Sequence, residues 1–186
     1  MIRLFAALSP PPEIAEALIQ RQSGLAGALW RPAEALHVTL RFFGEITETM
    51  ADDLDAELSR AARGALTVEL EGAGAFADGG DIHAVWAGVA ENPALRQLAR
   101  RCETAARRSG LAPDTRRYRP HLTLAYLNRA EPAQVAAWIQ ANNLLRSPPF
   151  TLRAFGLYSS RPGAAGDGYR LERSYPLGAA EKSGGM

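Results

Sequence analysis

The spacing of apolar and polar positions divides the chain into short strands and amphipathic helices. Residues 66–76 alternate as in a half-buried strand, whereas Met50, Leu54 and Leu58 recur at the four-residue spacing of a helix face. Prolines and glycines mark many of the boundaries. The pattern predicts strands at 2–8, 35–43, 66–76, 83–89, 120–127, 150–159 and 169–175, and helices at 11–25, 47–63, 92–109 and 131–142.

One short motif, His-x-Thr-Leu, occurs twice, at His37–Leu40 and at His121–Leu124. A second match, Leu66-Thr67-Val68 with Phe150-Thr151-Leu152, has the same offset of 84 residues. The strands and helices around the two motifs also follow one another in the same order. Two matches in register within a repeated order of elements favour an internal duplication.

The duplicated order predicts an α+β fold with two similar lobes related by a pseudo-twofold axis. Each lobe would carry a mainly antiparallel sheet, with helices on the outer faces and the two sheets facing each other across a central cleft. We expect residues 1–177 to form one bilobal domain, with pseudo-repeats at about 1–80 and 82–160 and a last strand at 168–177. Residues 178–186 are predicted to be a disordered tail.

The composition is typical of an ordinary globular protein. Hydrophobic residues make up 47% of the 186 residues and charged residues 22%. The apolar start, residues 2–8, is too short to cross a membrane, and the single cysteine, Cys102, excludes an internal disulfide and a cysteine-based zinc site. We expect a cytoplasmic monomer that does not associate with membranes.

Charge is distributed unevenly between the two halves of the chain. Residues 1–93 carry 6 Arg and 14 Asp/Glu, a net charge of −8, whereas residues 94–186 carry a net charge of +9. Most of the positive excess is arginine, the side chain best suited to binding phosphate groups of a nucleic acid. The arginines of the predicted helix 92–109 equally suit a solvated helix face, so both interpretations stay open.

The two motifs carry the residues of an acid/base site. In a strand, residues two apart share a face, so His37 lies beside Thr39, and His121 beside Thr123. In one cleft, two imidazoles with ordinary pKa values of about 6.5 allow one ring to be neutral and the other protonated. Such a pair suits in-line displacement at a phosphodiester, with a base for the attacking water and an acid for the leaving oxygen.

Other side chains add to this chemistry or stand apart from it. The threonine hydroxyls would donate to phosphate oxygens, and Arg41, two residues beyond Thr39, would add a cation on the cleft face. His83 has no counterpart in the repeat, and we interpret it as a partly exposed strand histidine. Two histidines without a carboxylate or cysteine at ligand spacing are a poor zinc site, so we expect neither a metal nor another cofactor.

Longer segments around the motifs resemble a known family. These segments are Trp30-Arg31-Pro32 followed by His37-Val38-Thr39-Leu40-Arg41-Phe42-Phe43-Gly44-Glu45, then Tyr118-Arg119-Pro120-His121-Leu122-Thr123-Leu124-Ala125, and finally Leu157-Tyr158-Ser159-Ser160-Arg161, Tyr169 and Tyr175-Pro176-Leu177. They resemble the two-histidine phosphoesterase superfamily and, within it, the bacterial and archaeal RNA 2′,3′-cyclic phosphodiesterases, historically called 2′-5′ RNA ligases. The resemblance covers about residues 1–177.

The resemblance implies a bilobal fold with both motifs in a central cleft, and metal-independent opening of a terminal 2′,3′-cyclic phosphate to a 2′-phosphomonoester. The substrate would be RNA with such an end, or a cyclic nucleotide. By this resemblance His37 and His121 form the acid/base pair, and Thr39 and Thr123 bind the phosphate. The second histidine would activate water and the first would protonate the departing 3′ oxygen.

The sequence departs from the family pattern at one position. Relatives often carry an arginine five residues after the second histidine, where this chain has Tyr126. Arg129 or Arg41 would then contact the phosphate, and Tyr126 would stack on a base. Three alternatives remain open: a small cyclic nucleotide as the substrate, a module that holds a nucleotide or an RNA end without turnover, and weak 2′-5′ RNA ligase activity in the reverse direction.

Overall fold

The computed structural model describes residues 1–160 and 168–178 of the chain. The strands are β1 (Ile2–Leu8), β2 (Leu29–Trp30), β3 (Val38–Ile46), β4 (Leu66–Val68), β5 (Leu70–Asp78), β6 (Asp81–Val89), β7 (His121–Tyr126), β8 (Phe150–Leu152), β9 (Ala154–Ser160) and β10 (Tyr169–Pro176). The helices are α1 (Pro12–Ile19), α2 (Glu48–Ala61), α3 (Pro93–Arg108) and α4 (Pro132–Asn142), with a short 3₁₀ helix, η1 (Ala33–Ala35). No helix in these ranges is long and apolar enough to span a membrane. Residues 179–186 of the predicted tail, and Arg161, lie outside the described residues.

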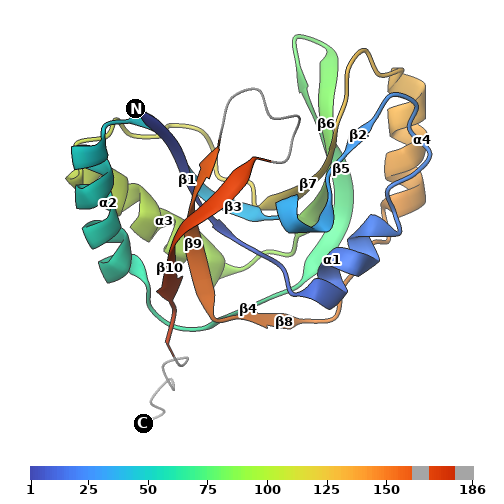
Figure 1. Cartoon of the computed structure of the whole chain (residues 1–186). Helices are drawn as coiled ribbons and strands as arrows, with labels where there is room; N and C mark the ends of the chain where they lie inside the picture. Colours follow the sequence, from blue (N-terminus) through green and yellow to red (C-terminus); the bar gives the residue numbers. More distant parts are fainter. Residues whose placement is uncertain (161–167, 179–186) are drawn as a thin grey trace.

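The described strands form one eight-stranded antiparallel sheet and a separate two-stranded one. The large sheet has the order β10-β9-β1-β3-β7-β6-β5, with β2 added beside β7, and β4 pairs with β8 in the small sheet. In Figure 1, α2 and α3 lie together at one side of the molecule, and α1 and α4 lie at the other. The predicted α+β architecture is confirmed, and the structure adds that the sheets of the two lobes are continuous through the backbone pair Val38–Leu122.

Residues 84 positions apart face each other at two places. In the large sheet Val38 pairs with Leu122, and in the small sheet Thr67 pairs with Thr151. The hydroxyl oxygens of these two threonines are 3.0 Å apart. Equivalent residues contact each other where a twofold axis passes, so both pairs mark the pseudo-twofold axis of the chain. The bounds of the repeats, at about 1–80 and 82–160, stay a prediction.

Two predicted strands are each split into two shorter ones. The segment 66–76 breaks at Glu69, and the segment 150–159 breaks at Arg153, because the chain leaves the small sheet at these points and enters the large one. The carbonyl oxygens of the two break residues accept hydrogen bonds from the backbone N–H groups of Ala90 and Leu177, each at 2.8 Å. The backbone therefore stays paired while it changes sheets.

The first helix is shorter than its pattern predicts. It ends at Ile19 instead of residue 25, and the chain then turns through Gly24 and Gly27, whose φ angles are +82° and +71°. Glycine adopts such positive φ angles without the steric cost that other residues carry. The following β2 and η1 contain two and three residues, which is too short for a hydrophobic period to reveal.

The apolar residues of both motifs lie in the hydrophobic core. Val38, Leu40, Leu122 and Leu124 are buried, as expected for the sheet face opposite the histidines, and α3 packs against β3. The core therefore fixes the same strands that present the polar motif residues on the other face.

Leu122→Ala should lower the free energy of unfolding by about 2–5 kcal/mol, because it removes a fully buried side chain from the junction of the two lobes. Leu144→Ala is the matched control, since Leu144 is 90% exposed and its truncation should change stability by less than about 0.5 kcal/mol. Urea denaturation measures both. Equal stability of the two variants would contradict this account of the junction.

Candidate active site

The two motif histidines are held by the same local contact. Nδ1 of His37 donates to the carbonyl oxygen of Ala35 at 2.8 Å, and Nδ1 of His121 donates to that of Arg119 at 2.6 Å. Because a carbonyl only accepts, the proton of each neutral ring lies on Nδ1, and Nε2 is left to accept or release a second proton. Both imidazoles are therefore oriented as acid/base groups.

A β-bulge interrupts each motif strand just after the threonine. On β3, Thr39 pairs with Ala7 while Arg41 pairs with the adjacent Ala6, so Leu40 is an extra residue. On β7, Leu124 is the extra residue at the equivalent place. One extra residue shifts the alternation of faces by one position. Beyond the bulges, it is therefore the residue five after each histidine that returns to the face of the threonines.

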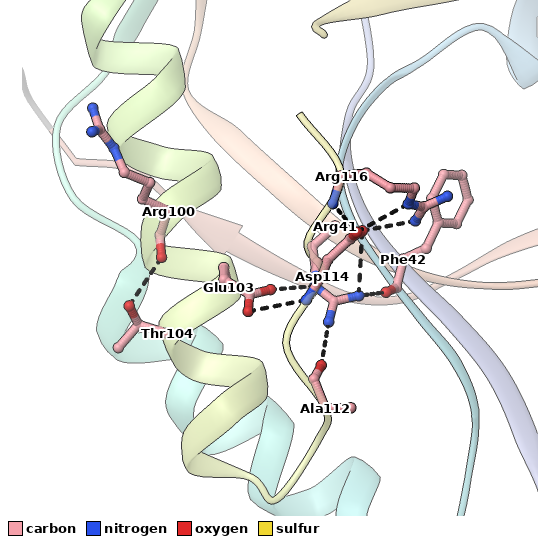
Figure 2. Close-up of polar contacts among 8 residues, drawn as sticks. All are labelled: Arg41, Phe42, Arg100, Glu103, Thr104, Ala112, Asp114 and Arg116. Atoms are coloured by element: carbon pink, nitrogen blue, oxygen red, sulfur yellow. Dashed lines mark hydrogen bonds and ion pairs between the residues drawn. The ribbon is translucent and has the colours of Figure 1, made fainter. Parts of the chain in front are cut away.

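Arg41 lines the same cleft as Thr39 and His121, and its guanidinium points toward α3 and the segment that follows α3. There Nε donates to Glu103 at 2.5 Å, Nη2 donates to the carbonyl oxygen of Ala112 at 2.8 Å, and Nη1 lies 3.9 Å from a carboxylate oxygen of Asp114 (Figure 2). The Arg41 side chain is 10% exposed. Its donors tie β3 to α3 and to the segment that follows α3, and its predicted contact with a phosphate stays a prediction.

The bulges bring two aromatic residues to the face of the threonines. Phe42 and Tyr126 occupy equivalent positions in the repeats, and they pair with Phe5 and Ala84 on the neighbouring strands. Both side chains are exposed. Stacking of Tyr126 on a base stays a prediction.

Aromatic rings enclose both histidines. The rings of Phe5 and Tyr169 lie 5.0 and 5.2 Å from the His37 ring, measured between centroids. On the other side of the cleft, the rings of Phe76 and Trp86 lie 4.6 and 6.2 Å from that of His121. These walls exclude water from the flanks of the imidazoles.

A cleft of about 700 Å³ extends from Thr39 and His121 toward α3. Its basic lining residues are Arg41, Arg96, Arg100, Arg116, Arg117 and Arg119, so the second-half arginine excess faces this cleft at several positions. Arg129 is not among the residues that line it. It lies exposed beyond β7 with a φ of 52°, and its predicted phosphate contact stays a prediction.

One cationic residue, Arg31, belongs to the site although the motif chemistry did not predict it. β2 pairs Leu29 with Tyr126 and Trp30 with Ala125, so the alternation places Arg31 on the cleft face. Its guanidinium carbon lies 5.4 Å from the centroid of the Tyr126 ring and 5.2 Å from that of Tyr169. The only sequence signal was its position in a family-like segment, because the contact with Tyr169 joins distant parts of the chain.

Burial lowers the pKa of both motif histidines. Burial is the main cause that lowers the pKa of His37 to about 4. The hydrogen bond to Ala35 raises this pKa, whereas the charges of Arg31 and His121 lower it further. Burial likewise lowers the pKa of His121, against the hydrogen bond to Arg119. Both rings are therefore neutral in the free protein near pH 7. The expected neutral and protonated pair requires a bound anion, which favours the charged form of a nearby histidine.

The chain matches a known family in sequence and in fold. Residues 10–164 match the model of the 2′-5′ RNA ligase superfamily. The RNA 2′,3′-cyclic phosphodiesterase of Archaeoglobus fulgidus is 31% identical over 134 residues, which cover 70% of this chain and 76% of the relative. That of Escherichia coli is 34% identical over 126 residues, covering 66% and 70%. The crystal structure of E. coli LigT complexed with 3′-AMP superposes with a TM-score of 0.74 at 28% identity, covering 95% of this chain and 98% of LigT.

The chain therefore belongs to the 2′-5′ RNA ligase superfamily, and the resemblance found in its sequence is confirmed. The matched residues include both His-x-Thr-Leu motifs.

The lowered pKa of His37 predicts an acid-sensitive contribution to stability. Unfolded His37 takes up a proton near pH 6.5, whereas the folded protein resists protonation until about pH 4, so stability falls as the pH drops through this window. Between pH 7 and pH 4.5 the wild type should lose about 2 kcal/mol more of its unfolding free energy than His37→Asn, whose amide can still donate to Ala35. Urea denaturation at both pH values measures this, with exposed His83→Asn as control. An identical pH dependence of wild type and His37→Asn would contradict the prediction.

Proposed function

We propose that the chain is a hydrolase that opens the terminal 2′,3′-cyclic phosphate of RNA to a 2′-phosphomonoester without a metal or other cofactor. The observation that carries the proposal is the pair of equivalent histidines, each with Nδ1 bound to a carbonyl and Nε2 left for proton transfer. The relatives in A. fulgidus and E. coli, both RNA 2′,3′-cyclic phosphodiesterases, support the substrate class. RNA as the partner, the monomeric state and a cytoplasmic location stay predictions.

Substrate binding would prepare the two histidines for different roles. A cyclic phosphate between the motifs brings an anion to a site whose imidazoles are both neutral. Its charge raises their pKa values and allows one ring to hold a second proton. The hydroxyls of Thr39 and Thr123, on the same face, would donate to the non-bridging oxygens as negative charge builds there.

Displacement would then proceed in line at phosphorus. Nε2 of His121 takes a proton from water while the water oxygen forms a bond to phosphorus. The bond between phosphorus and the 3′ oxygen breaks, and this oxygen receives the proton held by Nε2 of His37. The product carries a 2′-phosphate and a 3′-hydroxyl, and proton exchange with solvent restores both rings.

This division of roles rests on the family resemblance. Because the pKa of His37 is lowered, a bound anion must raise it before the ring can hold the proton that it gives to the leaving oxygen. Attack by a 5′-hydroxyl in place of water would use the same groups and form a 2′-5′ linkage. In dilute solution water is far more abundant, so hydrolysis should dominate.

His37→Ala and His121→Ala should each lower the rate of cyclic phosphate opening by a factor of about 10²–10⁴, because each removes one proton-transfer group. The measurement is turnover of an RNA oligomer ending in a 2′,3′-cyclic phosphate, with the product phosphate position read by NMR. Arg63→Ala, at an exposed position after α2 and outside the residues that line the cleft, is the control and should retain activity. EDTA should not reduce the rate.

Full activity in either of the two variants would exclude the acid/base pair. A 3′-phosphate product would overturn the assignment of the 3′ oxygen as leaving group. Tight binding of the RNA end by the wild type without turnover would instead favour a binding module.

A further inference from the structure

Arg31 is a buried cation for which the described residues offer no counter-ion. Its residue is 3% exposed, and its Nη2 atom has no hydrogen-bond partner within residues 1–160 and 168–178. No carboxylate in these ranges lies within ion-pair distance of it. Burying a charge costs free energy unless an opposite charge or hydrogen bonds compensate. An anion from outside the described residues would therefore compensate the buried charge of Arg31.

The surroundings of Arg31 hold its guanidinium in place. The rings of Tyr126 and Tyr169 both lie within cation–π distance of the guanidinium carbon, at 5.4 and 5.2 Å. The backbone is also fixed, because its N–H donates to the carbonyl oxygen of Leu124 at 2.8 Å and its carbonyl accepts from Gln22 at 2.7 Å. Aromatic contacts satisfy the faces of a guanidinium but leave its N–H groups without acceptors. Arg31 is thus a rigid, prepositioned donor.

This donor lies beside the catalytic pair. The Tyr169 ring that contacts Arg31 also meets the His37 ring edge-on, 5.2 Å away between centroids. Leu124, the bulge residue that accepts the Arg31 N–H, directly follows Thr123. The positive charge of Arg31 contributes to the lowered pKa of His37, which agrees with this closeness. A phosphate held between the two motifs would therefore lie close to the guanidinium of Arg31.

We propose that Arg31 binds the terminal phosphate of the substrate, donating from Nη2 to a non-bridging oxygen and offsetting the negative charge that builds there during displacement. The guanidinium group is suited to this because its N–H groups match the geometry of phosphate oxygens. In this arrangement Tyr126 supports the guanidinium through its ring and is not itself a phosphate ligand. The inference deepens the proposed function and rests on it for the identity of the anion.

The test compares the binding of adenosine 2′-monophosphate, adenosine 5′-monophosphate and adenosine to the wild type, Arg31→Lys and Arg31→Met by calorimetry. Arg31→Met should lower the affinity for the 2′-monophosphate by a factor of about ten or more, because a charge-assisted hydrogen bond is lost. Adenosine and the 5′-monophosphate should bind as before. The affinity of Arg31→Lys for the 2′-monophosphate should lie between those of the wild type and Arg31→Met, since an ammonium keeps the charge but not the planar geometry. Arg63→Met, at an exposed position after α2, is the matched control and should bind all three ligands as the wild type does.

Thermal melting separates this role from a purely structural one. Replacing an unpaired buried cation by methionine should leave the melting temperature unchanged or raise it. A lowered melting temperature in Arg31→Met together with unchanged binding of the 2′-monophosphate would assign Arg31 to the scaffold and overturn the proposal. Loss of affinity for the 5′-monophosphate alone would also overturn it, because the anion would then be a different phosphate of the strand.

The same variants connect the proposal to turnover. Arg31→Met should lower kcat/KM for adenosine 2′,3′-cyclic monophosphate by a factor of about ten or more if the wild type hydrolyses it. If Arg31→Met loses affinity for the 2′-monophosphate but the wild type opens no cyclic phosphate, the result contradicts the proposed function and supports Arg31 as an anion-binding residue. Wild-type affinity and wild-type turnover in Arg31→Met would overturn the anion site and leave the proposed function intact.

Discussion

The backbone pair Val38–Leu122 is the constraint on which the rest of the structure depends. It joins β3 to β7, and so joins the two halves of the large sheet, on the pseudo-twofold axis. His37 and His121 are the residues directly before these two positions, so the same pairing places both rings on one face of the sheet, where the charge of His121 acts on the pKa of His37. The second pair on the axis, Thr67–Thr151, fixes the far side of the molecule in the same symmetric way. The pairing of two copies of one strand motif is thus enough to bring the two histidines to the same face of the sheet.

The symmetry of the motifs stops at the residues around them. Both histidines donate from Nδ1 to the carbonyl two residues earlier, and both strands carry a bulge after the threonine. Tyr169, by contrast, lies on β10, which follows the second repeat and adds an edge strand to one half only. Its ring contacts that of His37 and the guanidinium of Arg31, so the two identical motifs have different surroundings. Different surroundings give a physical reason for the two histidines to differ in pKa.

Much of this could be predicted from the sequence, because the relevant signals are local or repeated. The strand alternation placed His37 and Thr39 on one face, and the offset of 84 residues indicated the duplicated motif. The direction in which the Arg41 side chain points, toward Glu103 and Ala112, could not be predicted in this way, since the bulge at Leu40 depends on how β3 pairs with β1. Strand spacing alone assumes perfect alternation, and a single extra residue reverses it for every position beyond.

The position of Arg31 in the site could not be predicted from local sequence patterns either. Its position on the cleft face follows from the pairing of β2 with β7, and β2 is only two residues long. Its contact with Tyr169 joins residues that are far apart in the chain. Features fixed by tertiary contacts of this kind carry no periodic signal, even where the residue itself lies in a family-like segment.

The most direct test of the acid/base pair is NMR of the histidine ring nitrogens during a titration with adenosine 2′-monophosphate. In the free protein at pH 7, His37 and His121 should both be neutral with the proton on Nδ1, because burial disfavours their charged forms and a carbonyl accepts from each Nδ1. On binding the phosphate, one of the two rings should take up a second proton on Nε2. A neutral ring with its proton on Nε2 in the free protein, or two rings that remain neutral in the complex, would contradict the account.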